Sequence, residues 1–215
     1  QTMIFPADLA QTSERQTLVS TALEKFGHID ILVNNAGIET EGAFLNLTWE
    51  AIRETIEINL AAPMQLTHLT LPSMLQQGSG HIVNIASIGA KNGVAYAAVY
   101  CGTKAGLAEW TRGLRLELAG TGVHFSTIFP GYVTEVGMFA RFNMTPPWLI
   151  GSCKPEQVAQ AVIRAIEQEK LEIIVNARLI IMRLSFILNE LSAGLGDWLM
   201  YQSGAVDFQR RKVGL

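Results

Sequence analysis

Tyr100 and Lys104 lie four residues apart in the helical segment YCGTK. Side chains at this spacing share one face of a helix, so the Lys104 ammonium would lie near the Tyr100 phenol. A free tyrosine has a pKa of about 10, and a nearby ammonium lowers that pKa because it favours the tyrosinate. The pair is therefore a candidate general acid–base. The same spacing is also expected if Tyr100 is an ordinary helical tyrosine with a solvated lysine beside it.

Two more polar residues precede this pair. Ser87 follows the apolar segment HIVNIA and could hydrogen bond a substrate carbonyl and stabilise a developing alkoxide, or it could cap the turn after a strand. It lies in no G-x-S-x-G motif, which argues against a serine nucleophile. Asn59 is four residues before Pro63, which has no N–H to offer the Asn59 carbonyl. That carbonyl could hold a water linking Lys104 to solvent, or Asn59 could be an exposed residue of a kinked helix.

The elements that must position these residues alternate along the chain. Short segments rich in Ile and Val are typical of buried strands, and longer amphipathic segments separate them. This order predicts an α/β fold, a parallel sheet covered by helices on both faces. The expected strands are residues 29–34, 81–86, 123–129 and 172–175, and the expected helices are residues 13–26, 48–77, 100–119 and 155–168.

Ligands of such sheets bind beyond the carboxyl ends of the strands. The residues there are small, polar or turn-forming: Asp8, the turn Asn34-Asn35-Ala36-Gly37, Ser87, and Pro130-Gly131. Asparagines in the turn could brace the next strand, while Ala36 and Gly37 let a flat ligand approach, although an ordinary Asn/Gly turn looks the same. Asp8 could accept a hydrogen bond from an adenine amino group or could cap a turn.

Composition narrows the class of protein. Of the 215 residues, 49% are apolar and 16% charged, and the net charge is −3, which excludes a disordered chain and gives no basic footprint for nucleic acid. Two cysteines favour a reducing, cytoplasmic compartment, and no metal-ligand spacing is present. We find no repeat or linker, and expect a single domain over residues 1–215.

Together these motifs resemble the short-chain dehydrogenase/reductase family, from Thr2 to about Asn176. The resemblance implies a Rossmann-like, doubly wound, three-layer fold and an NAD- or NADP-dependent oxidoreductase that interconverts a secondary alcohol and a ketone. It implies that Tyr100 is the acid–base, Ser87 orients the carbonyl, Lys104 binds the nicotinamide ribose and Asn59 holds a water. It also implies cofactor contacts from Asp8, Leu9, Asn35, Ala36, Gly37, Tyr100, Lys104, Pro130, Gly131, Val133 and Thr134.

The sequence departs from the family at its start. The opening TMIFPADLA resembles the end of the family's third strand, and the Gly-rich turn that would hold the pyrophosphate does not precede it. We therefore expect the sheet to lack the family's first strands, with roughly fifty to sixty residues upstream. The choice between NAD and NADP depends on that region. The alternative function is a non-catalytic binding or scaffold protein on the same fold.

The last third of the chain suggests the substrate and partners. Residues 135–153 lie where the family has its substrate loop and are rich in Met and aromatic residues, among them Phe139 and Trp148, so we expect an apolar carbonyl or alcohol substrate. The same apolar side chains, and those of residues 178–191, could instead pack on the core or on a partner. Residues 178–191 predict an apolar helix, in an extension over residues 178–215 that could make weak contact with a membrane surface. Helices 48–77 and 100–119 are expected to pair in a homodimer or homotetramer.

Overall fold

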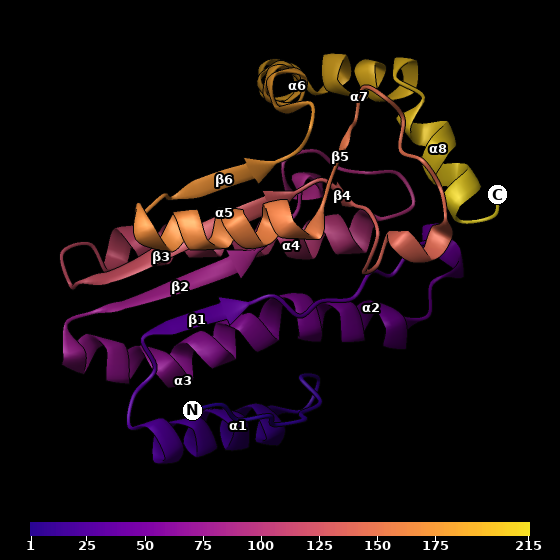
Figure 1. The fold of residues 1–215 in the computed structure, drawn as a ribbon. Helices are drawn as coiled ribbons and strands as arrows, with labels where there is room; N and C mark the ends of the chain where they lie inside the picture. The colour runs from indigo at the N-terminus through magenta and orange to yellow at the C-terminus, as the bar shows by residue number, and fades with distance from the viewer.

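The computed structural model describes residues 1–215, and its centre is a parallel sheet in the order β1-β2-β3-β6 (Figure 1). The expected strands are confirmed to within one or two residues. Two short strands, β4 and β5, form a separate parallel pair beyond the main sheet. The bounds are β1 Ile31–Asn34, β2 Gly80–Ile85, β3 Val123–Pro130, β4 Tyr132–Val133, β5 Ser152–Cys153 and β6 Glu172–Val175.

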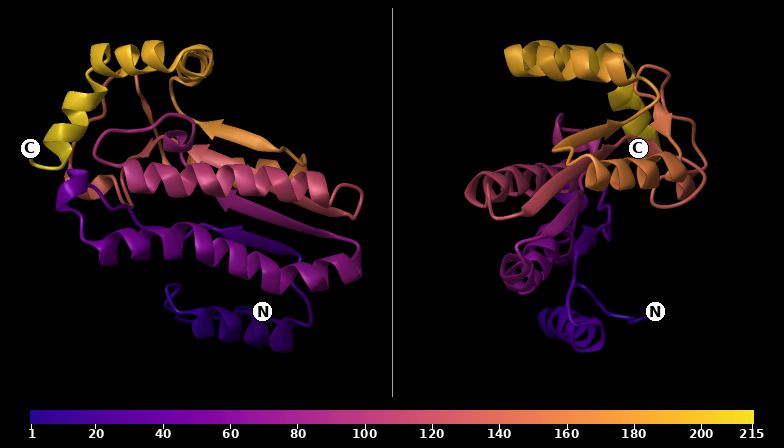
Figure 2. Two further views of the ribbon diagram at one scale, coloured as in Figure 1. Left: turned by 180° about the vertical axis from the view of Figure 1, so that it is seen from behind. Right: turned by 60° about the vertical axis from the view of Figure 1, so that its left-hand side comes forward.

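Helices cover both faces of the sheet, so the expected three-layer α/β arrangement is confirmed (Figure 2). Helices α3 and α4 pack on one face and α5 on the other, while α1 packs against α3. A buried apolar cluster that includes Val83, Ile128 and Ala165 lies between the sheet and α5. The bounds are α1 Thr12–Phe26, α3 Ala62–Gln77, α4 Ala98–Glu117 and α5 Pro155–Glu167.

The expected helix over residues 48–77 contains a π-helical turn at Glu57–Ala61, between α2 (Trp49–Ile56) and α3. The N–H of Ala62 bonds to the Glu57 carbonyl five residues back, so the helix widens just before Pro63, which lies in the first turn of α3. The widened turn lets the helix continue past a proline that has no N–H to donate.

The opening segment differs from the expectation. Residues 1–8 contain no strand, because their backbone pairs with no strand of the sheet. The first strand of the sheet is β1, and it is an edge strand on which Ile31 and Val33 are 46% and 42% exposed.

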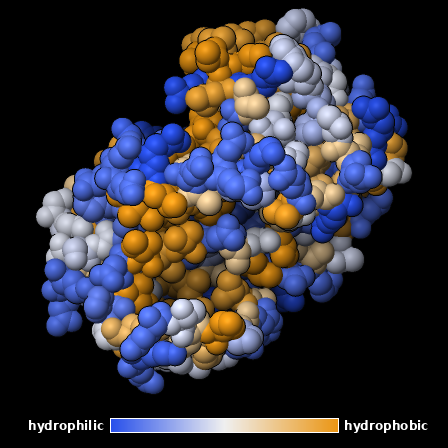
Figure 3. Space-filling view, in the orientation of Figure 1, coloured by the Kyte–Doolittle hydropathy of each residue, from blue (hydrophilic) through white to orange (hydrophobic).

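Three helices lie together at the carboxyl end of the sheet: α6 (Leu179–Leu191), α7 (Ala193–Gln202) and α8 (Ala205–Lys212) (Figure 1). The helix expected at 178–191 is thus confirmed. Apolar side chains gather on the surface where α6 lies (Figure 3), and Ile180 and Leu191 are each 76% exposed. None of the helices is both long and apolar enough to cross a membrane.

Candidate active site

A cavity of about 1000 Å³ opens at the carboxyl ends of the strands. Its walls contain Ser87, Tyr100 and Lys104, which were expected to meet there, and 26 of its 41 lining residues are hydrophobic. On the side away from the sheet, α6, α7 and α8 close it with side chains such as Met182 and Met200. The cavity therefore joins a small set of polar groups to a large apolar volume.

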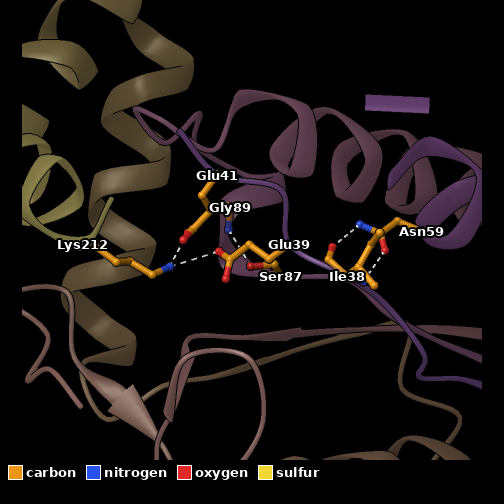
Figure 4. Close-up of polar contacts among 7 residues, drawn as sticks. All are labelled: Ile38, Glu39, Glu41, Asn59, Ser87, Gly89 and Lys212. Carbon is orange, nitrogen blue, oxygen red and sulfur yellow. Dashed lines mark hydrogen bonds and ion pairs between the residues drawn. The ribbon is translucent and has the colours of Figure 1, made fainter. Parts of the chain in front are cut away.

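Lys104 occupies the buried inner face of α4, where its side chain is anchored. Its residue is 3% exposed, its Nζ donates to the Ile85 carbonyl at 2.8 Å, and it lies 5.9 Å from the centre of the Tyr100 ring. Ser87 begins the turn after β2, where its Oγ accepts a hydrogen bond from the Gly89 N–H at 3.1 Å (Figure 4). The serine is thus both a cap, as the simpler interpretation held, and a wall of the cavity.

Burial dominates the electrostatics of this pair. It raises the pKa of Tyr100 above its ordinary value, with a further increase from the Glu39 carboxylate and an opposing interaction with the Ser87 hydroxyl. Burial also lowers the pKa of Lys104 to about 8. Burial thus outweighs any lowering of the Tyr100 pKa by Lys104, since both charged forms lose hydration in the low-dielectric interior. Tyr100 is protonated at neutral pH.

Asn59 is fully buried in the π-helical turn and does not line the cavity. Its amide donates to the Ile38 carbonyl and accepts from the Ile38 N–H, both at 2.8 Å (Figure 4), and it also donates to Thr103. The side chain thus ties the helix to the segment after the 34–37 turn. The interpretation of Asn59 as an exposed residue of a kinked helix is wrong.

The 34–37 turn lies on the cavity wall, with Asn35, Ala36 and Gly37 among the lining residues. Asn34 donates to the Asn84 side chain at 2.8 Å, so it braces the neighbouring strand as expected. A Cβ on Gly37 would lie 3.1 Å from Asn59 Oδ1 and 3.3 Å from Lys104 Nζ. Gly37 therefore lets the turn pack directly against both of these groups.

The segment after β3 places three of its four expected residues, Pro130, Gly131 and Val133, on the cavity wall. A Cβ on Gly131 would lie 2.4 Å from the Asn176 amide nitrogen, so any larger residue at this position would have to displace the Asn176 side chain. The fourth, Thr134, is turned towards β5, where its hydroxyl donates to the Cys153 carbonyl at 3.3 Å.

Of the remaining residues expected to contact substrate or cofactor, one lines the cavity and three lie outside it. Phe139 is buried, lines the cavity and packs on Tyr132 with ring centres 4.6 Å apart. Trp148 is 65% exposed, lies outside the cavity wall and is covered by the Arg178 guanidinium at 4.2 Å. Asp8 and Leu9 also lie outside this cavity. Asp8 accepts from the Ala10 N–H at 2.9 Å, which is the turn role that the sequence left open.

Sequence reasoning missed a buried ion cluster on the far wall. Lys212 of α8 has no exposed side-chain surface and pairs with Glu39 at 3.2 Å and with Glu41, both in the segment that follows β1 (Figure 4). Its Nζ also lies 4.6 Å from the centre of the Phe142 ring. Burial, followed by the neighbouring Glu39, raises the pKa of Glu41 to about 7 even though Lys212 opposes the shift. The cluster fastens α8 to the chain beside the 34–37 turn.

The cavity floor fits the ribose and nicotinamide end of a dinucleotide. The buried Lys104 ammonium has three N–H donors, and the Ile85 carbonyl satisfies one of them. Ribose hydroxyls are suitable acceptors for the other two. Ala36, Gly37 and Gly131 keep side chains out of the floor beside it, which allows a flat ring to lie close to the backbone.

The fold and these residues define a dehydrogenase, and the comparison of the sequence with family models agrees. Residues 1–146 match the model described as short chain dehydrogenase. The chain belongs to the short-chain dehydrogenase family and is an NAD(P)-dependent oxidoreductase of that family.

Individual relatives give the same result. The ketoacyl reductase HetN of Nostoc sp. is 42% identical over 212 residues, which cover 97% of this chain and 74% of that protein. Among solved structures, a short-chain dehydrogenase from Streptomyces avermitilis has a TM-score of 0.74 at 28% identity, covering 92% of this chain and 78% of that one.

A second solved structure contains a cofactor. It is a metagenomic short-chain oxidoreductase in complex with NADP, with a TM-score of 0.65 at 28% identity, covering 79% of this chain and 71% of that one. The curated relatives are longer than this chain, which spans only 56% and 57% of two others that it matches.

Proposed function

We propose that the chain reduces a ketone on an apolar substrate to a secondary alcohol, with Tyr100 as the proton donor. The observation that carries the proposal is that Tyr100, Ser87 and Lys104 line one largely apolar cavity. Tyr100 is protonated at neutral pH, so it can donate a proton to a bound ketone.

Each residue has a separate task in this proposal. When bound, NAD(P)H supplies the hydride. The Ser87 hydroxyl orients the substrate carbonyl, and the Tyr100 hydroxyl gives its proton to the oxygen as negative charge develops there. Lys104 binds the ribose through its free N–H donors. Asn59 holds the backbone at Ile38 in place, and through it the 34–37 turn. A water bound at the Asn59 carbonyl would link Lys104 to solvent, and Tyr100 would regain its proton by that route.

The substrate class follows from the rest of the cavity. Met138, Phe139, Met182, Phe186 and Met200 contribute to a predominantly apolar wall, and flexible Met side chains adapt to ligands of irregular shape. The relative from Nostoc is named a ketoacyl reductase, and an acyl chain would fill such a volume. We therefore propose a ketone on a long alkyl or acyl chain.

The test is a panel of 2-alkanones and 3-ketoacyl esters of increasing chain length, assayed with NADPH and with NADH. We expect kcat/KM to rise with chain length, and Tyr100→Phe to reduce kcat by at least about a hundredfold. The variant should still bind NADPH, measured by the change in nucleotide fluorescence. Preference for small charged ketones or sugars would contradict the substrate class, and a Tyr100→Phe variant with most of its rate would contradict the role of Tyr100.

The non-catalytic alternative predicts a different result. A scaffold protein on this fold should turn over no ketone in the panel and show neither a fluorescence change nor a thermal shift with either nucleotide. Binding of a nucleotide without turnover would leave the family assignment intact and contradict only the proposed substrate.

We also propose that the protein assembles as a homodimer or homotetramer and that α6 makes weak contact with a membrane surface. On α4 the apolar side chains of Leu107, Ala108, Leu114 and Leu118 are buried or packed against the chain's own core, so they do not support pairing. Pairing is supported by the exposed apolar side chains of Trp49 and Ile56 on α2 and of Leu116 on α4. The membrane proposal is supported by the exposed apolar side chains of α6.

A further inference from the structure

Gln209 is a buried polar residue on the cavity wall that has no function in the site described above. It lies on α8, is 3% exposed and lines the cavity. Its Oε1 has no hydrogen-bond partner in the protein. A half-turn of the amide exchanges the two atoms, so the side chain can present either an acceptor or a donor.

An amide in this position destabilises the fold unless something bonds to it, whereas an apolar side chain of similar size would not. The neighbouring positions on the same face of α8 are Ala205 and Phe208, both buried and apolar. The packing of the helix therefore does not require a polar residue at 209. A ligand in the cavity is a sufficient reason for one.

Glu39 is a second polar residue of the same cavity wall. It lines the wall, and one of its oxygens is 3.2 Å from the Nζ of Lys212, which follows Gln209 by three residues on α8. Residues three apart on a helix are neighbours, so Gln209 and the lysine that holds Glu39 lie on one face of α8, and Glu39 and Gln209 line the same cavity. Glu39 is an acceptor with capacity for further hydrogen bonds, since each carboxylate oxygen accepts more than one.

We propose that Gln209 and Glu39 form a second recognition point, which binds a hydroxyl group that the substrate carries away from its ketone. A hydroxyl can donate to the carboxylate and also pair with the amide, whereas an apolar chain can do neither. The ligand is then a hydroxylated alkyl ketone, held at Ser87 and Tyr100 through its carbonyl and at α8 through its hydroxyl. Lys212 is a positioning residue, because it acts by holding Glu39. This inference rests on the proposed function.

The experiment compares 2-dodecanone with derivatives that carry one hydroxyl at carbon 6, 8, 10 or 12. We expect the wild-type protein to prefer at least one derivative over the parent by roughly tenfold to a hundredfold in kcat/KM, since removing the partner of a buried polar group costs about that much. Gln209→Met should abolish the preference, measured as the ratio of kcat/KM for the hydroxyketone to kcat/KM for 2-dodecanone. Gln202→Met, at an exposed site on α7, is the matched control and should retain the preference.

Thermal shifts with the same compounds, in the absence of nucleotide, supply a readout that does not depend on turnover. The preferred hydroxyketone should raise the melting temperature of the wild type more than 2-dodecanone does, and Gln209→Met should remove the difference. If no ketone is reduced, the proposed function fails and the thermal shift still tests the recognition point. A wild type that binds all five compounds equally, or a Gln209→Met variant that keeps the preference, would overturn the inference. So would a fall in the unliganded melting temperature of Gln209→Met, because it would mean that the amide is satisfied within the protein.

Discussion

Replacing Lys212 by methionine keeps the apolar stem of the side chain and removes the cation between two buried carboxylates. The Lys212 side chain is fully buried, and those of Glu39 and Glu41 are only 11% and 6% exposed. Removing one partner of a buried ion pair costs about 3–5 kcal/mol. We expect the free energy of unfolding of Lys212→Met at pH 8 to fall by about 3 kcal/mol, the lower end of that range, because a carboxyl in the cluster can take up a proton.

The loss should depend on pH. The pKa of Glu41 is raised from its ordinary 4.5 to about 7, so the stability that Glu41 contributes is complete below pH 4.5 and is lost as the pH rises through 7. Without Lys212 the pKa of Glu41 rises further, and the penalty for ionising it extends to higher pH. At pH 5 Glu41 carries a proton in both proteins. The two proteins should therefore differ much less in stability at pH 5 than at pH 8.

Urea unfolding followed by tryptophan fluorescence at pH 5 and pH 8 measures both quantities. The triple variant Lys212→Met/Glu39→Gln/Glu41→Gln has no charge left in the cluster and should recover most of the loss. Lys154→Met, which breaks the exposed pair with Glu135, is the control and should have no measurable effect. A loss of the same size at both pH values, or a triple variant as unstable as Lys212→Met, would refute the electrostatic explanation.

Three further predictions concern the cofactor, the assembly and the surface. Because burial lowers the pKa of Lys104 to about 8, its ammonium is lost as the pH rises through 8, so NADPH affinity should fall between pH 7 and 9 and Lys104→Met should remove this dependence; a flat wild-type titration would contradict the role. Light scattering at micromolar concentration should show a dimer or tetramer that Leu116→Glu, on the exposed side of α4, dissociates; a wild-type monomer refutes the assembly. Co-sedimentation with anionic vesicles should fall for Ile180→Ser on α6 and stay unchanged for Ile163→Ser on α5, which is also exposed; equal effects of the two changes would argue against a specific surface.

Local signals were sufficient for the central fold. The strands are short runs of apolar residues between turn-forming ones, and β6 was predicted at exactly the residues it occupies, 172–175. The expected meeting of Ser87 with Tyr100 and Lys104 depended on the helical spacing of four, on the rule that parallel strands end at one edge of the sheet, and on the resemblance to the family.

Properties that depend on burial could not be predicted in the same way. Spacing placed Lys104 near Tyr100, but the direction of the Tyr100 pKa shift depends on how much water the surrounding chain excludes. Trp148 is a residue type that often lines apolar pockets. Its side chain is nevertheless exposed, and its ring packs against Arg178 at the surface.

The ion cluster depends on a contact between segments far apart in the sequence. Glu39 and Lys212 are separated by 173 residues, and no local pattern marks Glu39 as buried. The one available signal was the spacing of Ala205, Phe208 and Lys212, which places the lysine on the same face of α8 as two apolar residues. That pattern predicts a buried lysine without identifying the carboxylates that compensate its charge.

The pairing of Glu41 with Lys212 also has a consequence for how the chain is made. The lysine is translated 171 residues after the glutamate, which at ribosomal rates of 5–20 residues per second is a delay of roughly 10 to 30 s. During this interval the strands up to β6 can assemble while the two carboxylates have no counter-ion and the wall formed by α8 does not exist. A nascent chain at this stage would expose the apolar interior of its future cavity to solvent. Chaperone binding during synthesis should therefore be strongest between the completion of β6 and the emergence of α8.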